Sequence, residues 1–317
     1  MVSIVSTALT RCRARVTIGV RHCLGHADHV ALPHDWSDSR TEKQPRMNDV
    51  LEVNEIQVSN LRLWVERYGA DPRGDEVVLL HRSMGSRDAI DLVQRLATEH
   101  FRVSVIHLPG FGNSERPDWA RSPRDLAIIL TQFLNRSFEG PVHMIGLGLG
   151  GWVAAEIATM AEDHLKTLAL VSPAGLLPRQ GEIFDHMLVT IPVYLRRCCS
   201  DPLTYEKMYR DITTPEQIAE WELNREMTAR IAWRPWYYSQ QLPHLLTEFR
   251  KRAVVIWGDD DLVIPLECGR QYAELLTFGE LHIVPNGGHH VEVEQPDAVA
   301  SILSVTFAGA EELNRSA

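Results

Sequence analysis

The chain has 317 residues, of which 44% are hydrophobic, and its formal net charge at pH 7 is −10. This is enough for one large domain with a buried core. The negative charge argues against nucleic acid or an anionic membrane surface as a partner. No apolar run approaches the roughly 20 residues that a membrane span needs. The five cysteines lack zinc-site spacing, and their odd number is typical of a reducing compartment.

Residues 1–46 differ from the rest of the chain in their charge. No acidic residue occurs before Asp28, whereas arginine is frequent in the same stretch (Arg11, Arg13, Arg15, Arg21). This pattern resembles an organellar transit peptide. An upstream start codon, with Met47 as the working start, is our preferred interpretation. We therefore treat residues 1–46 as a leader that is disordered or wrongly assigned, and we expect a cytoplasmic protein.

The first predicted elements after Leu51 are strands. Apolar residues alternate on both sides of Ser59-Asn60, which predicts a β-hairpin. The continuous apolar run at 76–81 predicts a strand that is buried on both faces. A helix over 89–97 and a strand over 101–106 follow, and Ser122-Pro123 is a typical helix start.

The alternation of strand and helix continues and is then interrupted. A strand at 141–145, a helix at 152–161 and a strand at 167–171 complete a pattern that predicts an α/β fold. We expect a doubly wound, mostly parallel sheet with helices on both faces.

The pattern between residues 178 and 248 is helical and rich in aromatic residues, without a clear strand. Strands resume at 253–257 and 281–284. We interpret 178–248 as a helical cap inserted between two parts of the core, 47–177 and 249–309, with a tail at 310–317. The aromatic side chains line a ligand pocket or belong to the interior of the cap, and the pattern fits both alternatives.

The most informative motif is Gly146-Leu147-Gly148-Leu149-Gly150-Gly151, between a predicted strand and a predicted helix. This is the setting of the G-x-S-x-G nucleophile elbow, where a serine sits in a strained turn. Gly148 stands at the serine position, which relieves strain but removes the attacking hydroxyl. The same glycines satisfy the dinucleotide fingerprint G-x-G-x-x-G. However, Ser172-Pro173 stand after the next strand, where that fingerprint needs an acid.

Several motifs in order resemble those of the α/β-hydrolase superfamily, over about residues 53–307. The resemblance is greatest to esterases and carbon–carbon-bond hydrolases. The matching segments are 81–86 (oxyanion-hole loop), 107–114 (a Gly-rich turn), 146–151 (elbow), 257–265 (triad acid) and 286–290 (triad histidine). The departures from the family pattern lie at the active site and comprise Arg82, His107, Leu147 and Gly148.

The resemblance implies that Asp261 orients His289 and that the amides of Leu149 and Ser83 form the oxyanion hole. It implies no metal or organic cofactor. Loss of a serine nucleophile alone costs about 10⁶ in kcat in a serine protease. Ordinary ester hydrolysis should therefore be feeble.

These residues are compatible with several functions. His289 and Asp261 could activate a water in the space left at Gly148, giving weak hydrolysis of a small hydrophobic ester or ketone-like compound. Proton-transfer or lyase chemistry on the same pair is a variant of this interpretation, and Ser83 could be a substitute nucleophile. We take weak, non-serine hydrolysis as the first hypothesis. The alternative is a pseudoenzyme that binds a small hydrophobic ligand under the cap. A purely structural His289–Asp261 hydrogen bond, or a decayed gene product, also fits the sequence.

Overall fold

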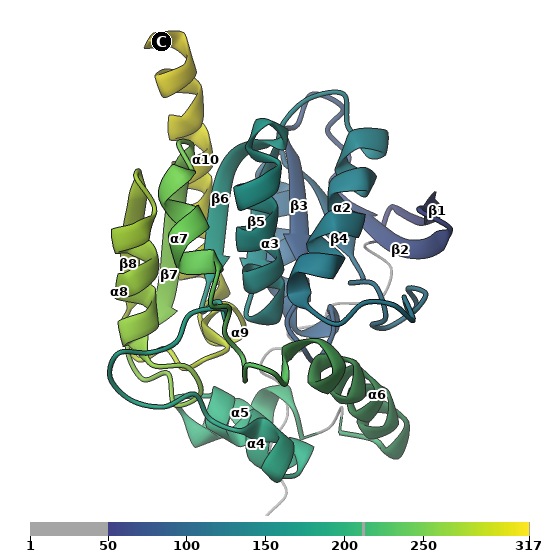
Figure 1. Ribbon diagram of the computed structural model, residues 1–317, viewed down its shortest axis with the longest axis vertical. Helices are drawn as coiled ribbons and strands as arrows, with labels where there is room; N and C mark the ends of the chain where they lie inside the picture. Colours follow the sequence, from purple (N-terminus) through teal and green to yellow (C-terminus); the bar gives the residue numbers. More distant parts are fainter. Residues whose placement is uncertain (1–49, 211–212, 317) are drawn as a thin grey trace, which may run out of the picture. The chain divides into compact units, whose positions relative to one another are not determined.

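The computed structural model describes residues 50–210 and 213–316; the expected leader at 1–46 and the Met47 start lie outside them. The described residues form an eight-stranded sheet with helices on both faces (Figure 1). The strands are β1 (Glu52–Val58), β2 (Leu61–Tyr68), β3 (Glu76–Leu80), β4 (Arg102–Ile106), β5 (Val142–Leu147), β6 (Leu165–Val171), β7 (Arg252–Gly258) and β8 (Gly279–Val284). The helices up to β6 are η2 (Arg87–Ala89), α1 (Ile90–Thr98), α2 (Pro123–Ser137), α3 (Leu149–Met160) and η3 (Glu162–His164). Those that follow are η4 (His186–Leu188), α4 (Ile191–Cys198), α5 (Pro202–Met208), α6 (Pro215–Ala232), α7 (Leu242–Leu245), η5 (Leu246–Glu248), α8 (Leu266–Leu275), α9 (Val291–Glu294) and α10 (Pro296–Ser316).

The strand order is β1-β2-β4-β3-β5-β6-β7-β8. Strand β2 runs antiparallel to β1 and β4, and the remaining neighbours are parallel. This confirms the predicted α/β fold with a mostly parallel sheet. The predicted hairpin is also present, because β1 pairs with β2 on both sides of Ser59-Asn60. In its turn, Ser59 and Asn60 have φ values of 49° and 66°. Two consecutive residues in the left-handed region form the turn whose twist matches that of the flanking strands.

Strand β5 shows how the sheet separates two cores. Met144 packs into the core shared with α2, α3 and the helices after β6, whereas Ile145 packs into the core shared with α1 and α10. Successive strand residues point to opposite faces, so a strand that is buried at every position serves both cores. The whole of β5 is buried.

The start of α2 follows the sequence prediction. The Ser122 hydroxyl accepts a hydrogen bond from the Asp125 amide, and the Asp125 carboxylate accepts one from the Ser122 amide. This reciprocal arrangement, with Pro123 at the first helical position, satisfies amides that have no partner inside the helix.

The elements around the glycine motif are longer than predicted. Strand β5 continues to Leu147 and α3 begins at Leu149, so Gly148 alone separates them. A Cβ atom at Gly150 would lie 2.3 Å from the Leu80 carbonyl oxygen. The glycines therefore allow close packing of α3 against β3, and Gly146 and Gly150 lie within β5 and α3.

The segment 178–248 contains η4, α4, α5, α6, α7 and η5, and its described residues include no strand. We call it the helical insertion. Helices α4, α5 and α6 lie together beyond one end of the sheet (Figure 1). Asn224 of α6 donates to the Met84 carbonyl after β3 at 3.0 Å, and the Phe184 amide donates to Val263 after β7 at 2.8 Å. The insertion therefore contacts loops at the carboxyl ends of the strands, where the candidate site residues lie.

The C-terminal helix α10 extends to Ser316 and includes the residues that we had expected to form a tail. Among the described helices, none combines the length and the hydrophobicity needed to cross a bilayer.

Candidate active site

Gly148 forms a sharp turn between β5 and α3. Its φ and ψ are 51° and −112°, a conformation that is strained for any residue with a Cβ. Its amide donates to the Val171 carbonyl at 3.0 Å, and its own carbonyl accepts from the amides of Trp152 and Ala174. The turn is therefore fixed by its neighbours, and glycine adopts it with little strain.

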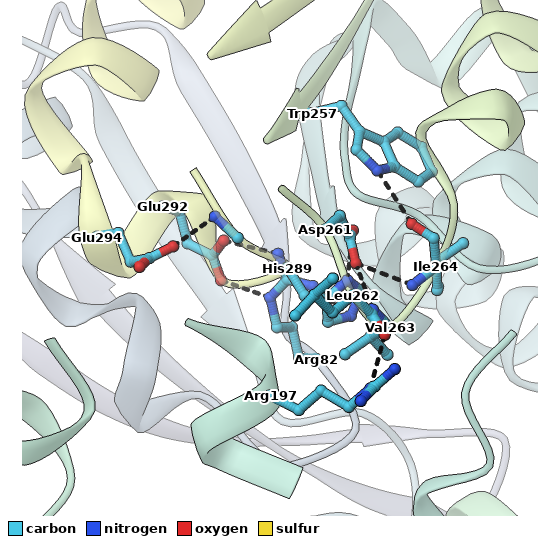
Figure 2. Close-up of polar contacts among 11 residues, drawn as sticks. Arg82, Arg197, Trp257, Asp261, Leu262, Val263, Ile264, His289, Glu292 and Glu294 are labelled. Atoms are coloured by element: carbon cyan, nitrogen blue, oxygen red, sulfur yellow. Dashed lines mark hydrogen bonds and ion pairs between the residues drawn. The ribbon is translucent and has the colours of Figure 1, made fainter. Parts of the chain in front are cut away.

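Asp261 and His289 lie together, as the motifs predicted (Figure 2). Asp261 Oδ2 is 2.8 Å from His289 Nδ1, and both side chains are buried. Asp261 Oδ1 accepts from the amides of Val263 and Ile264 at 2.8 and 2.9 Å. The loop after β7 thus fixes the carboxylate, and the carboxylate fixes one edge of the imidazole ring.

Arg82 occupies the other edge of the imidazole. Its Nη1 atom lies 3.1 Å from His289 Nε2, and its Nε and Nη2 atoms donate to Glu292 at 2.5 and 2.6 Å (Figure 2). Both side chains of this ion pair are buried. Burial acts to lower the pKa of Arg82, but the Glu292 carboxylate outweighs it and holds the pKa above its usual value. Because a guanidinium can only donate, His289 Nε2 must accept and Nδ1 must carry the proton toward Asp261.

The Arg82 side chain also fills the space beside Gly148. A Cβ atom at residue 148 would lie 2.9 Å from Arg82 Nη1 and 3.2 Å from its Cγ. The expectation of room for a water at this point is therefore wrong, because the guanidinium occupies it. Glu292 was not identified from the sequence. The available signal was Arg82 itself, since a buried arginine needs a carboxylate partner.

The two other departures from the family pattern, His107 and Leu147, make contacts that stabilise the fold. His107 Nε2 lies 3.1 Å from Ser86 Oγ and 3.2 Å from Glu66 Oε1, and its Nδ1 accepts from the Asn113 amide. It therefore stabilises the turn that follows β4. Leu147 is buried in the core beside α1 and α10.

Of the two predicted oxyanion-hole residues, only Leu149 is adjacent to Gly148 in sequence. Leu149 begins α3, directly after Gly148. Ser83 is buried. The donor roles of the Leu149 and Ser83 amides remain predictions. Within residues 50–210 and 213–316, no three His, Cys, Asp or Glu side chains are arranged to hold a metal ion.

A second buried carboxyl group, Asp88 on η2, interacts electrostatically with the Arg82–Glu292 pair. Burial and the charge of Glu292 raise the pKa of Asp88 to about 7, although Arg82 acts in the opposite direction. Asp88 Oδ2 lies 4.0 Å from His290 Nδ1, which is hydrogen bonded to the Tyr209 hydroxyl at 2.7 Å. Burial holds the pKa of His290 well below its usual value, so this histidine is neutral and does not offset the charge of Asp88.

The raised pKa of Asp88 predicts a pH-dependent stability. Between pH 4 and 7 the folded state binds more protons at this carboxyl than the unfolded state, so stability falls as pH rises through this range. Asp88→Asn should therefore increase the free energy of unfolding by about 4 kcal/mol at pH 8 and by about 1.5 kcal/mol at pH 5. Urea titrations of both proteins from pH 5 to 8 measure this, with the exposed Asp118→Asn as control. An Asp88→Asn effect that does not change with pH would contradict the assignment.

Comparison with known proteins identifies related sequences and folds. The profile of the Alpha/beta hydrolase family matches residues 77–302. The hydrolase YugF of Bacillus subtilis strain 168 is 22% identical, over 80% of this chain and 97% of that protein. The 2-hydroxy-6-oxo-6-(2'-aminophenyl)hexa-2,4-dienoic acid hydrolase of Metapseudomonas resinovorans is 23% identical, over 79% of this chain and 90% of that protein. A similar structure is that of the serine hydrolase CCSP0084, from the polyaromatic-hydrocarbon-degrading bacterium Cycloclasticus zankles. Its TM-score is 0.70 at 16% identity, over 81% of this chain and 98% of that one.

Proposed function

Since the chain belongs to the Alpha/beta hydrolase family, we propose that it is a member without serine-type catalysis that binds a small hydrophobic ligand. It is related to carbon–carbon-bond hydrolases and esterases. One observation carries the proposal. The Arg82 guanidinium lies 2.9 Å from the place of a Cβ at residue 148 and 3.1 Å from His289 Nε2. It thus occupies the position of the nucleophile and blocks the base.

The same contact disfavours the water-activation hypothesis. A general base must accept a proton through a free lone pair, and the Nε2 lone pair of His289 already accepts from Arg82. Releasing it requires Arg82 to leave a buried bidentate ion pair, and breaking such a pair costs about 3–5 kcal/mol. The positive charge that the base acquires would also develop next to a guanidinium. Both effects raise the barrier for non-serine hydrolysis.

The position of the helical insertion supports a ligand-binding role. We propose that residues 178–248 act as a cap, because their hydrogen bonds reach the loops after β3 and β7 that carry Arg82 and Asp261. The Metapseudomonas relative is named for a hydroxy-oxo-dienoic acid. For this chain we propose a small hydrophobic carbonyl compound, which binds without turnover.

The test compares hydrolysis by the wild type and by His289→Ala. We expect equal rates, within about twofold, on 4-nitrophenyl acetate, 4-nitrophenyl butyrate and a 2-hydroxy-6-oxo-dienoate, because the His289 lone pair is engaged. Initial rates are followed by absorbance, with His282→Ala as the control for catalysis by an exposed imidazole. A fluorophosphonate probe should leave the wild type unlabelled. If the hydrolysis rate of the wild type exceeds that of His289→Ala more than tenfold, weak hydrolysis by His289 and Asp261 is the correct function instead.

A further inference from the structure

Buried polar groups without hydrogen-bond partners gather where the helical insertion meets the candidate site. His186 on η4 is 1% exposed, and neither of its ring nitrogens has a partner among the described residues. The indole N–H of Trp236 is also buried without a partner there. About nine-tenths of buried polar groups in proteins are hydrogen bonded. Three unsatisfied ring nitrogens in two contacting side chains therefore indicate a missing polar ligand.

The rings around His186 form a continuous aromatic cluster. The His186 centroid lies 4.8 Å from that of Tyr194, 5.4 Å from that of Trp236 and 5.1 Å from that of Tyr237. We call these four residues the His186 cluster. Trp233, which is 45% exposed, packs edge-on against Trp236 at 5.5 Å. The aromatic surface thus extends from solvent to a buried imidazole.

The His186 cluster borders the Arg82–His289 site. The ring centroid of Tyr194 lies 6.3 Å from that of His290, next to His289, and the Ser83 hydroxyl, next to Arg82, acts to lower the pKa of Tyr237, which burial raises. Both Tyr237 and Tyr194 lie within the electrostatic influence of Arg82, and His186 lies within that of His289. A ligand that contacts this cluster would therefore lie beside the elbow.

The backbone at Tyr237 is in a conformation that few residues with a side chain adopt. Its φ is 60°, and two hydrogen bonds hold it there: its amide donates to Ala232, and its carbonyl accepts from the Gly175 amide. Strain of this kind persists where the surrounding structure enforces it, and it occurs often at functional sites. This is independent support for a site at the cluster.

The chemistry of the unsatisfied groups defines the ligand. Burial, aided by the charges of Arg225 and His289, lowers the pKa of His186 to about 3. The imidazole is therefore neutral and offers one donor and one acceptor, whereas the Trp236 indole offers a donor only. The charge of Arg82 is balanced by Glu292, and that of Arg225 by Glu222 at 3.4 Å, so both cations near the cluster already have a carboxylate partner. These groups complement an aromatic or aliphatic molecule with a carbonyl oxygen and a hydroxyl group.

We propose that His186 and Trp236 recognise a small neutral hydroxy-carbonyl compound, with its apolar part against Tyr194 and Tyr237. The inference rests on the proposed function, because it assumes that the ligand binds under the cap. It goes further by assigning polar recognition to the cap and not to Asp261 and His289.

Calorimetric titration with 3-hydroxyacetophenone tests the inference, with ethylbenzene as the apolar match and 3-hydroxybenzoate as the anionic match. We expect the wild type to bind 3-hydroxyacetophenone at least tenfold more tightly than either. His186→Phe should weaken this binding at least tenfold, because a hydrogen-bonding partner of the ligand is lost. Trp236→Phe should act in the same direction, and the exposed Trp119→Phe should have no effect.

Thermal unfolding without ligand provides a second readout. His186→Phe removes two unsatisfied buried nitrogens, so its Tm should equal or exceed that of the wild type. If His186→Phe does not fold, Trp236→Phe still tests the proposal.

Three outcomes would overturn the inference. These are equal binding of ethylbenzene and 3-hydroxyacetophenone by the wild type, unchanged binding by the folded variants, or tighter binding of 3-hydroxybenzoate, which would show that the ligand is anionic. None of these results depends on hydrolysis, whereas turnover that requires His289 would refute the proposed function and leave the binding result intact.

Discussion

Replacing Glu292 with leucine is expected to lower the free energy of unfolding by about 3–5 kcal/mol, the usual consequence of removing one partner of a buried ion pair. The Arg82 side chain is 3% exposed and makes two of its hydrogen bonds to Glu292, at 2.5 and 2.6 Å. Without that carboxylate, the guanidinium is left buried with an uncompensated charge. Urea unfolding followed by circular dichroism measures the loss.

Two controls separate the charge from general disruption. In Arg82→Met/Glu292→Leu both charges are replaced by apolar groups, and most of the stability should return. The exposed pair Arg116–Glu226, at 2.9 Å, is the matched surface case. There Glu226→Leu should change stability by less than about 1 kcal/mol. An equal loss in the single and double variants would show that the cavity, and not the unpaired charge, causes the effect.

The second prediction concerns the recovery of catalysis. The triple variant Gly148→Ser/Arg82→Gly/Glu292→Gln is expected to raise kcat/KM for 4-nitrophenyl acetate by about 10³-fold, part of the roughly 10⁶ that a serine nucleophile supplies. Gly148 already forms a sharp turn between β5 and α3, and the 2.8 Å contact between Asp261 and His289 is in place. Removing the guanidinium frees His289 Nε2 to accept the serine proton.

The single variant Gly148→Ser should show no gain. Its Cβ would lie 2.9 Å from Arg82 Nη1, and the ion pair with Glu292 holds that atom in place. Gly148→Ala in the Arg82→Gly/Glu292→Gln background is the matched control, since it adds the Cβ without the hydroxyl. Activity in the single variant would show that Arg82 moves away freely. A folded triple variant that a fluorophosphonate does not label at residue 148 would refute the elbow assignment.

Local sequence patterns predicted most of the sheet. The alternation around Ser59-Asn60 predicted the β1–β2 hairpin, and the apolar runs predicted the central parallel strands, because strand patterns repeat every second residue and depend on immediate neighbours. The pairing of Asp261 with His289 was also predicted, from motifs that follow the ends of β7 and β8. Neighbouring parallel strands place such loops side by side.

The contents of the site could not be read from the same patterns. The sequence showed that Gly148 lacks a side chain, but not that the long side chain of Arg82 fills the space. That outcome depends on the torsion angles of one residue and on a partner far along the chain. Glu294 accepts a hydrogen bond from the Gly288 amide, whereas Glu292, two residues earlier, binds Arg82, and the sequence does not distinguish these two roles. In the same way, the lack of hydrogen-bond partners for the His186 ring nitrogens depends on how the surrounding side chains pack, and no sequence pattern indicates it.

The Arg82–Glu292 pair joins residues 210 positions apart, and this separation bears on how the protein folds. Closing so long a loop has an entropic cost, and such a contact gains its partner only after much of the intervening chain is ordered. We therefore place its formation after the folding transition state. Loss of Glu292 should then accelerate unfolding and leave the refolding rate nearly unchanged. The charge that blocks the elbow would in this way lengthen the lifetime of the native state.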